Sequence, residues 1–382
     1  MTRRILTSAS RGLLAFGLGA ALFAASAHAD QQKPDAGQGW LEHIRRQSTL
    51  TSTVPRNGDQ NPYAVVVSPV TSGRLHEGDV LVTNFNDARN LQGLGTTIVA
   101  YEPATRKLSV FASLPRHLPS CPGGVGLTTA FAVLKSGWSI VGSLPSDDGT
   151  TATKNDGCLM VLDNQGQLAG VIAGPAINGP WGNMAVVDRG GSATLFVSMT
   201  GFGVGAPGQE VVNRATVLRI ELAIPDGQPP VAVSQTVVAD GFGELADKAV
   251  FVIGPTGLAM GADDTLFVSD AIGNRVVAIP EASTRTTSAG TGREITRDGF
   301  IRRPLALVTA PNGHLLVANG LNGQVVEVDP ADGHQLTARW LDTDRAQQPP
   351  GSGDLFGMAM MPDGEGLYFV QDDMNTLVQA RK

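Results

Sequence analysis

The sequence predicts an all-β protein, a six-bladed β-propeller whose blades are four-stranded antiparallel sheets. Three observations predict this fold class. A unit of short strands and turns recurs six times along the chain, the turns are rich in Gly, Asn, Asp and Pro, and no segment has a long helical periodicity. Closing about six such sheets into a ring removes the sheet edges that would otherwise pair with other chains.

Each copy of the unit has the same order of elements. A strand rich in small apolar residues is followed by a tight turn, such as 310–313 (APNG) or 361–364 (MPDG), and by a second apolar strand. A polar turn, a third strand and usually a fourth, more polar strand complete the copy, and the copies recur at roughly 50 to 75 residues. They begin at Asn61, Thr128, Gly179, Gly254, Arg302 and Asp354.

The two ends of the repeated region complement each other. The last copy contains only three strands before the chain ends at Lys382, and residues 48–54 (STLTSTV) form a strand-like segment before the first copy. We expect this N-terminal strand to close the last blade. A truncation that removes it should therefore be far more damaging than one that ends near Gly39.

The first residues have the features of an export signal. Arg3, Arg4 and Arg11 precede an apolar run at 13–25, and 27–29 (AHA) offers small residues for cleavage after Ala29. No stretch reaches the roughly 20 apolar residues of a membrane-spanning helix. We expect a periplasmic or secreted protein without a membrane span. The expected organisation is a signal peptide at 1–29, a lead segment at 30–47 and a single propeller domain at 48–382.

Composition and cysteine content restrict the function further. The formal net charge is −7, and no cluster of Lys and Arg is present, so nucleic acid is not an expected partner. The two cysteines, Cys121 and Cys158, both lie in the exported part, where a structural disulfide is favoured over a free thiol. Cys121 precedes the first strand of the second copy and Cys158 begins its third, so an up-and-down sheet places both at one end.

The copy from Gly254 (GPTGLAMGADDTLFVSDAIGNRVVAI) resembles the NHL repeat. The copy from Arg302 resembles it partly, with Gly323 and Gln324 where the pattern has Asn and Arg, and the earlier copies are looser and longer. The resemblance implies a six-bladed propeller in a superfamily with gluconolactonase-like lactonases, strictosidine synthase-like proteins and peptidyl-amidoglycolate lyases. Fold alone does not choose among these activities. The matching positions in the first of these copies are Pro255, Gly257, Ala259, Phe267, Val268, Asp270, Asn274 and Arg275.

The ends of the second strands supply candidate metal ligands. Most residues at this position carry a side-chain oxygen, and in a propeller they are expected at the rim of the central channel, where such oxygens suit Ca²⁺. Asn84, Asn319 and Asp372 form the candidate metal set. The full series is Asn84, Ser143, Met199, Asp270, Asn319 and Asp372.

Two observations favour a structural role for these residues instead. The resemblance to gluconolactonase-like enzymes implies a glutamate at the start of the first inner strand, and Asn61, Pro62 and Tyr63 stand there. In addition, an Asp or Asn at this point often accepts hydrogen bonds from the backbone N–H groups of the following turn. The resemblance to the NHL repeat implies that Asp270, Asn274 and Arg275 form a local network that fixes this turn.

Three long inserts, 85–95, 145–157 and 201–214, all follow second strands and should crowd one face of the propeller. This loop-rich face, with Trp181 and Phe356 near the starts of inner strands, is the candidate ligand surface. Its candidate residues are Asn84, Ser143, Asp270, Asn319, Asp372, Trp181 and Phe356.

Two functions remain open. The first is a non-catalytic, monomeric scaffold that binds a protein, peptide, carbohydrate or small molecule on the loop-rich face. The alternative is a Ca²⁺-dependent hydrolase or lactonase of gluconolactonase-like type that uses the rim residues. The sequence contains no complete set of catalytic residues, so the first function is preferred.

Overall fold

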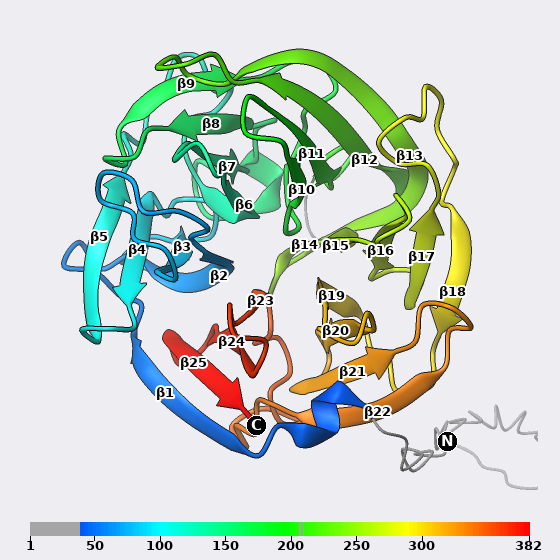
Figure 1. The fold of residues 1–382 in the computed structure, drawn as a ribbon. Coiled ribbons are helices and arrows are strands. Elements are labelled where there is room, and N and C mark those ends of the chain that lie inside the picture. The colour runs from blue at the N-terminus through cyan, green and yellow to red at the C-terminus, as the bar shows by residue number, and fades with distance from the viewer. Residues whose placement is uncertain (1–38, 206–207, 209) are drawn as a thin grey trace, which may run out of the picture. The chain divides into compact units, whose positions relative to one another are not determined.

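The computed structural model describes residues 39–382 except 206, 207 and 209. The expected signal peptide and most of the lead segment lie outside the described residues. Six antiparallel sheets surround a central channel, in agreement with the predicted six-bladed propeller (Figure 1). Among the described residues, no helix is long and apolar enough to cross a membrane.

The first three blades follow one another in chain order. Blade 1 contains β2 (Gln60–Val67), β3 (Val80–Asn86), β4 (Thr97–Glu102) and β5 (Lys107–Ser113). Blade 2 contains β6 (Leu127–Val133), β7 (Ser139–Ser143), β8 (Cys158–Leu162) and β9 (Leu168–Ile172). Blade 3 contains β10 (Ala185–Asp188), β11 (Ser192–Met199), β12 (Val212–Ala223), β13 (Val231–Asp247) and β14 (Phe251–Ile253).

The remaining blades complete the ring. Blade 4 contains β15 (Pro255–Met260), β16 (Leu266–Asp270), β17 (Arg275–Ile279) and β18 (Arg293–Arg297). Blade 5 contains β19 (Pro304–Thr309), β20 (Leu315–Asn319), β21 (Gln324–Val328) and β22 (Gln335–Trp340). Blade 6 contains β23 (Met358–Met360), β24 (Gly366–Gln371), β25 (Thr376–Arg381) and the N-terminal strand β1 (Arg46–Ser52).

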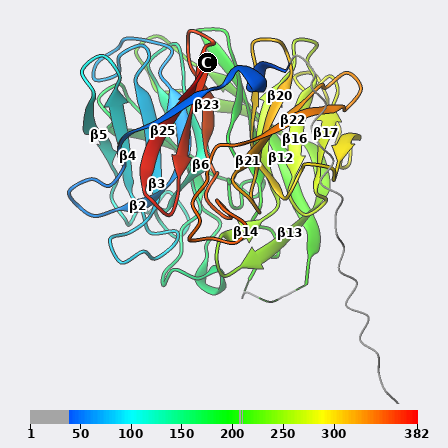
Figure 2. The same ribbon diagram turned by 90° about the horizontal axis from the view of Figure 1, so that it is seen from below.

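Strand β1 closes the ring as the sequence predicts. It pairs antiparallel with β25, and Figures 1 and 2 show the two strands side by side. The strand begins at Arg46, two residues before the expected start, and a short 3-10 helix η1 (Trp40–His43) precedes it. The backbone N–H groups of Trp40 and Leu41 donate to the buried Glu327 carboxylate of β21, at 2.9 and 2.7 Å. The lead segment is thus partly built into the propeller.

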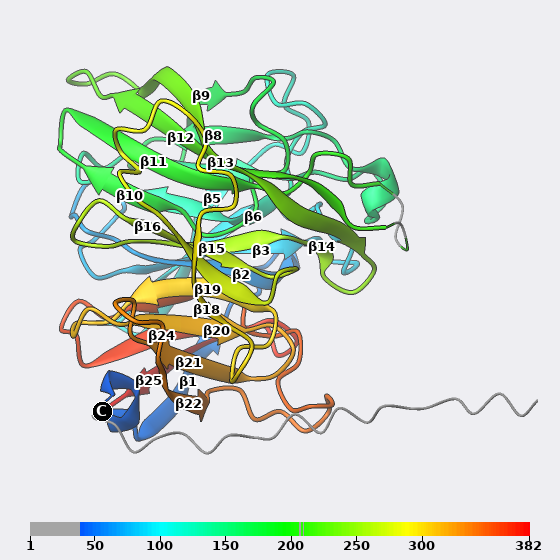
Figure 3. The same ribbon diagram turned by 90° about the vertical axis from the view of Figure 1, so that its right-hand side faces the viewer.

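Blade 3 departs from the expected four strands. Its outer strand β13 continues past the blade and folds back as the short strand β14, so this sheet has five strands. Figures 2 and 3 show β14 at one face of the ring, whereas η1 and the C-terminus lie at the other.

Packing between neighbouring blades forms the hydrophobic core, and the inner strands are the most crowded part. A Cβ atom added at Gly257 would contact the backbone of Leu305 in the next blade, and one at Gly357 would contact the backbone of Tyr63. Glycine is therefore required for this close approach. Within blade 2, Cys121 and Cys158 form the predicted disulfide, with their Cα atoms 5.3 Å apart.

Candidate functional site

At the loop-rich face, aromatic side chains fill the mouth of the channel. Tyr63 lies between Phe85 and Phe356, with ring centroids 4.6 and 4.3 Å away, and Trp181 meets Tyr63 edge-on at 5.4 Å. Phe251 contacts Phe85 and Trp181. All five are at most 2% exposed. We call these residues the aromatic cluster, and their packed rings occupy the centre of this face.

The β13–β14 hairpin delivers Phe251 to the cluster. Phe251 has a φ of +67°, a conformation that is strained for a bulky residue, so the packing of its ring must compensate. The insert at 85–95 supports the hairpin, because Gln92 Nε2 donates to the carbonyls of Lys248 and Ala249 at 3.2 and 3.3 Å. The same insert contacts the next one through Ser146, whose N–H donates to the Gly93 carbonyl. The long loops therefore cover the mouth.

Acidic groups lie against the aromatic cluster. Asp372 is partly exposed as a residue, but its carboxyl group is buried. This burial raises the pKa of Asp372 well above its usual range, and the nearby negative charges of Asp354 and Asp373 raise it further. Burial also raises the pKa of Tyr63, with Asp372 and Asp247 adding to the effect. The interior beside Tyr63 thus favours neutral groups.

Asn84 and Asn319 are engaged within the fold. The Asn84 amide donates to the carbonyl of Thr53, which follows the closing strand, and to the Thr97 hydroxyl. Asn319 donates to the Phe300 carbonyl and accepts the N–H of Arg302. Both amides link separate chain segments. The sequence allows either this structural role or metal binding for the two residues.

Ser143 and Asp270 also stabilise turns. Ser143 Oγ accepts the Gly126 N–H and donates to the Gly124 carbonyl. The Asp270 carboxylate accepts the Gly273 N–H at 2.9 Å and pairs with Arg275 Nε at 2.8 Å.

Asn274 does not join the network with Asp270 that the sequence predicts. Its amide contacts Asp298 and the Arg303 N–H rather than Asp270, so it links this turn to the start of blade 5.

Trp181 and Phe356 are the two aromatic residues that the sequence assigns to the candidate ligand surface. The structure places them beside the loop-rich face but inside the aromatic cluster, with exposed fractions of only 1% and 2%. A strand start can be located from the repeat, but whether the channel beside it is open depends on side chains from other blades.

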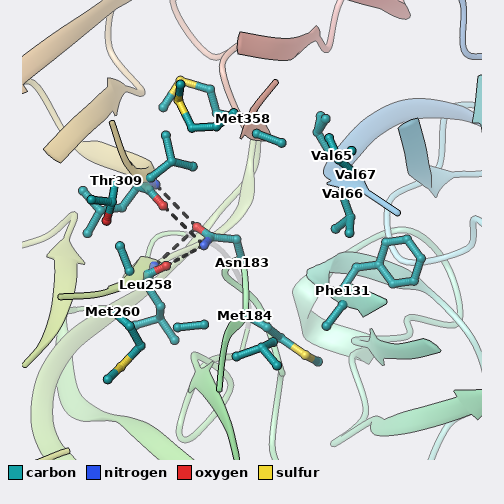
Figure 4. A pocket seen from close by; sticks show the side chains of 18 of the residues that line it. Val65, Val66, Val67, Phe131, Asn183, Met184, Leu258, Met260, Thr309 and Met358 are labelled. Carbon is teal, nitrogen blue, oxygen red and sulfur yellow. Dashed lines mark hydrogen bonds between the residues drawn. The ribbon is translucent and has the colours of Figure 1, made fainter. Parts of the chain in front are cut away.

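An open cavity lies on the opposite side of the channel. A pocket of about 400 Å³ is lined by residues of all six inner strands, and none of the five residues of the aromatic cluster lines it (Figure 4). Its wall is mostly aliphatic, with Phe131 and four methionines. These are Met184, Met260, Met358 and Met360. Flexible, polarizable methionines adapt to ligands of varied shape.

Asn183 supplies the pocket with its one amide side chain. It precedes β10, donates to the Leu258 carbonyl at 2.8 Å and lies 3.4 Å from the Leu258 N–H (Figure 4). It also lies within 3.5 Å of the N–H and carbonyl of Leu307. Asn183 therefore links blades 3, 4 and 5 at the channel.

Two titratable groups lie beneath the long loops. Glu244 of β13 is fully buried, and burial raises its pKa to about 8, although nearby Lys154 and Arg214 act in the opposite direction. Lys154, from the insert at 145–157, donates to Asn178 Oδ1 at 3.1 Å, and burial lowers its pKa.

Sequence reasoning did not identify the channel pocket or a group of carboxylates between blades 5 and 6. The pocket has a sequence signal, because each of its methionines lies in or beside an inner strand. The group of carboxylates also has a sequence signal, because Asp342, Asp344 and Asp354 lie in a single Gly- and Pro-rich crossover.

No protein-family model matches the chain, and no curated protein matches it by sequence. Solved structures do match. A gluconolactonase from Xanthomonas campestris has 14% identity and a TM-score of 0.56, over 91% of this chain and 94% of that one. A luciferin-regenerating enzyme has 11% identity and a TM-score of 0.54, over 88% and 95%.

The PQQ-bound form of an aldose sugar dehydrogenase from Streptomyces coelicolor has 15% identity and a TM-score of 0.51, over 88% of this chain and 98% of that one. At identities this low, the matches show that this chain shares the fold of these proteins, and they do not show that it shares their activities. The chain is a six-bladed β-propeller with the architecture that gluconolactonase-like proteins share.

Proposed function

We propose that the protein is a binding protein that takes a small apolar molecule into the channel pocket. The observation that carries this proposal is the pocket of about 400 Å³ with its aliphatic and methionine-rich wall. Ligand sites are typically concave, mostly apolar and of this size, with few polar groups. The proposed ligand site therefore lies at the opposite end of the channel from the loop-rich face, where the sequence predicts it. Export to the periplasm or beyond is part of the proposal.

Filling the pocket tests the proposal. Val66 lines it from β2, so Val66→Trp should remove binding of anilinonaphthalene sulfonate, a fluorophore whose aromatic rings bind apolar sites, to the folded protein. Val110→Trp is the control, because Val110 lies on outer strand β5 and is 38% exposed. Both variants should keep the wild-type circular dichroism spectrum. Equal fluorophore binding by a folded Val66→Trp variant would contradict the proposal.

The second candidate is a Ca²⁺-dependent lactonase. The fold likeness to gluconolactonases supports it, and so do the acidic groups around Tyr63. A metal in the channel mouth does not fit the residues present, however. The aromatic cluster fills the mouth, and both the nitrogen and the oxygen of the Asn319 amide are hydrogen-bonded within the fold. The Asn84 amide oxygen is buried without a partner, but among the described residues no second oxygen of the candidate metal set is buried in this way. We therefore derive no reaction step through a metal there.

The two candidates make opposite predictions for two variants. A lactonase that uses the rim residues would hydrolyse gluconolactone with added Ca²⁺ and lose this activity in the Asn84→Ala, Asp372→Ala double variant. That double variant should keep fluorophore binding, because neither residue lines the pocket. Hydrolysis that Val66→Trp preserves and the double variant abolishes would favour the lactonase.

A further inference from the structure

Three aspartates meet between blades 5 and 6 at the loop-rich face. Asp342 follows β22, Asp354 precedes β23, and Asp373 lies in the turn between β24 and β25. One carboxylate oxygen from each lies within 4.8 Å of the other two. We call these residues the aspartate cluster. The aspartate cluster joins the crossover at 341–357, between blades 5 and 6, to the β24–β25 turn of blade 6.

Two carboxylates of the cluster have buried oxygens without a partner. Asp342 Oδ1 accepts the Asp344 N–H at 2.8 Å, but its Oδ2 is buried and has no hydrogen bond. Asp354 Oδ1 accepts from Gln347 Nε2 at 2.9 Å, and its Oδ2 is likewise buried and alone. Asp342 is 0% exposed and Asp354 is 2% exposed. Burying a carboxylate oxygen without a partner is costly, so these atoms point to a bound group.

No positive side chain compensates the cluster. In the part of the chain that the structure describes, none of the three aspartates pairs with a lysine or arginine. The Gln347 amide donates to Asp354 and to Asp373, and its own Oε1 is a further buried oxygen without a partner. Two of the three carboxylates are buried, so ionising all three groups this close together without a cation would be costly.

We propose that the aspartate cluster binds a hard divalent cation, Ca²⁺. The ligand atoms that the cluster brings together are carboxylate oxygens, and among the described residues no His or Cys belongs to the group, which suits Ca²⁺ rather than Zn²⁺. Ca²⁺ tolerates irregular coordination, whereas Mg²⁺ requires a near-ideal octahedron. Asp373 is exposed, so it provides the side from which the ion enters.

The site has a structural role that is independent of any channel ligand. An ion held by Asp342, Asp354 and Asp373 fastens the crossover at 341–357 to the β24–β25 turn. Because β25 also pairs with the N-terminal strand β1, the ion stabilises the blade on which ring closure depends. Binding to the folded state alone raises the free energy of unfolding.

The experiment titrates the chelator-treated full chain with CaCl₂ alone, using calorimetry and thermal unfolding. We expect one site per chain and a higher melting temperature with Ca²⁺. Asp342→Asn and Asp354→Asn should each weaken binding by about tenfold or more, because the charge of the ligand set governs Ca²⁺ affinity. Asp226→Asn, in the exposed β12–β13 turn, should bind as wild type does.

Stability without Ca²⁺ shows whether the variants remain folded. Each asparagine variant removes like-charge repulsion, so it should melt at or above the wild-type temperature in chelator. A melting temperature of the wild-type protein that Ca²⁺ leaves unchanged would overturn the proposal. So would wild-type Ca²⁺ affinity in both variants, or equal affinity for Mg²⁺.

Discussion

Ser48 near the N-terminus and Gln379 near the C-terminus face each other across the closing pair of strands. The two residues are partners in the antiparallel register of β1 and β25, and Gln379 Nε2 donates to Ser48 Oγ at 2.8 Å. The ring is thus closed by backbone hydrogen bonds between the two ends of the described chain. Its stability depends on a strand that lies about 330 residues from its partner.

Stepwise N-terminal truncation tests this closure. Removal of residues through Gly39 should change the melting temperature little, because among the described hydrogen bonds it removes that from the Glu42 N–H to the Gly39 carbonyl, at 3.2 Å, and leaves Trp40, Leu41 and β1 in place. Removal through Arg45 should lower it, because the buried Trp40, Leu41 and Ile44 are lost. Removal through Val54 also exposes the edge of β25, so aggregation should follow. Thermal unfolding and size-exclusion chromatography measure both effects, and equal stability of the three truncated proteins would contradict the role of β1.

The sequence contained enough information for the architecture because strand and turn patterns are local. The six copies, the closing strand and the Cys121–Cys158 disulfide all followed from them. The fifth strand of blade 3 did not, because residues 244–253 continue an apolar pattern without a turn signal of the expected type.

The site was harder to predict because it depends on contacts between blades. Repeat alignment located Trp181 and Phe356 at inner-strand starts, but their burial results from Tyr63, Phe85 and Phe251, which come from other strands. Similarly, the Asn84 amide is engaged by Thr53, which the chain brings near only when the ring closes.

Glu327 should anchor the segment before β1. Its carboxylate accepts the N–H groups of Trp40 and Leu41, and Asn312 and His314 also contact it at 2.8 Å. Glu327→Gln cannot accept all of these bonds, so we expect a loss of about 1–3 kcal/mol in the free energy of unfolding. Limited proteolysis should also cut the N-terminal segment sooner.

Glu365→Gln serves as the control for Glu327. Glu365 is exposed and pairs with Lys382, at 3.4 Å, and such surface pairs contribute about 0–1 kcal/mol. Similar losses in chemical denaturation of the two variants would show that Glu327 does not anchor the segment.

Asp270 is predicted to stabilise the turn between β16 and β17. It is buried, and Asp270→Ala leaves the Gly273 N–H and the Arg275 Nε–H without their acceptor, while Arg275 Nη1 keeps its contact with Glu294. We expect a cost of about 1–3 kcal/mol in urea unfolding. Asp263→Ala, at an exposed turn in the same blade, should change stability by no more than about 0.5 kcal/mol. An unchanged melting temperature for Asp270→Ala would count against the turn-fixing role.

Glu244 should make stability depend on pH. Its pKa is about 8 in the folded protein, against an ordinary value of 4.5, so between these values the folded state keeps a proton that the unfolded state has released. The contribution of Glu244 is therefore complete below about pH 4.5 and is lost as the pH rises through about 8. Lys154 and Arg214 are the charged groups that favour its ionised form, and burial outweighs them.

Glu244→Gln isolates this contribution, because glutamine keeps the shape and cannot titrate. The fall in melting temperature between about pH 4.5 and 8 should be shallower in the variant than in wild type. Glu77→Gln, at an exposed loop position, controls for the loss of one acidic group and should follow the wild-type curve. Calorimetric scans across this range measure the slopes. Parallel curves for wild type and Glu244→Gln would mean that Glu244 is ionised in the folded protein, and that Lys154 and Arg214 outweigh its burial.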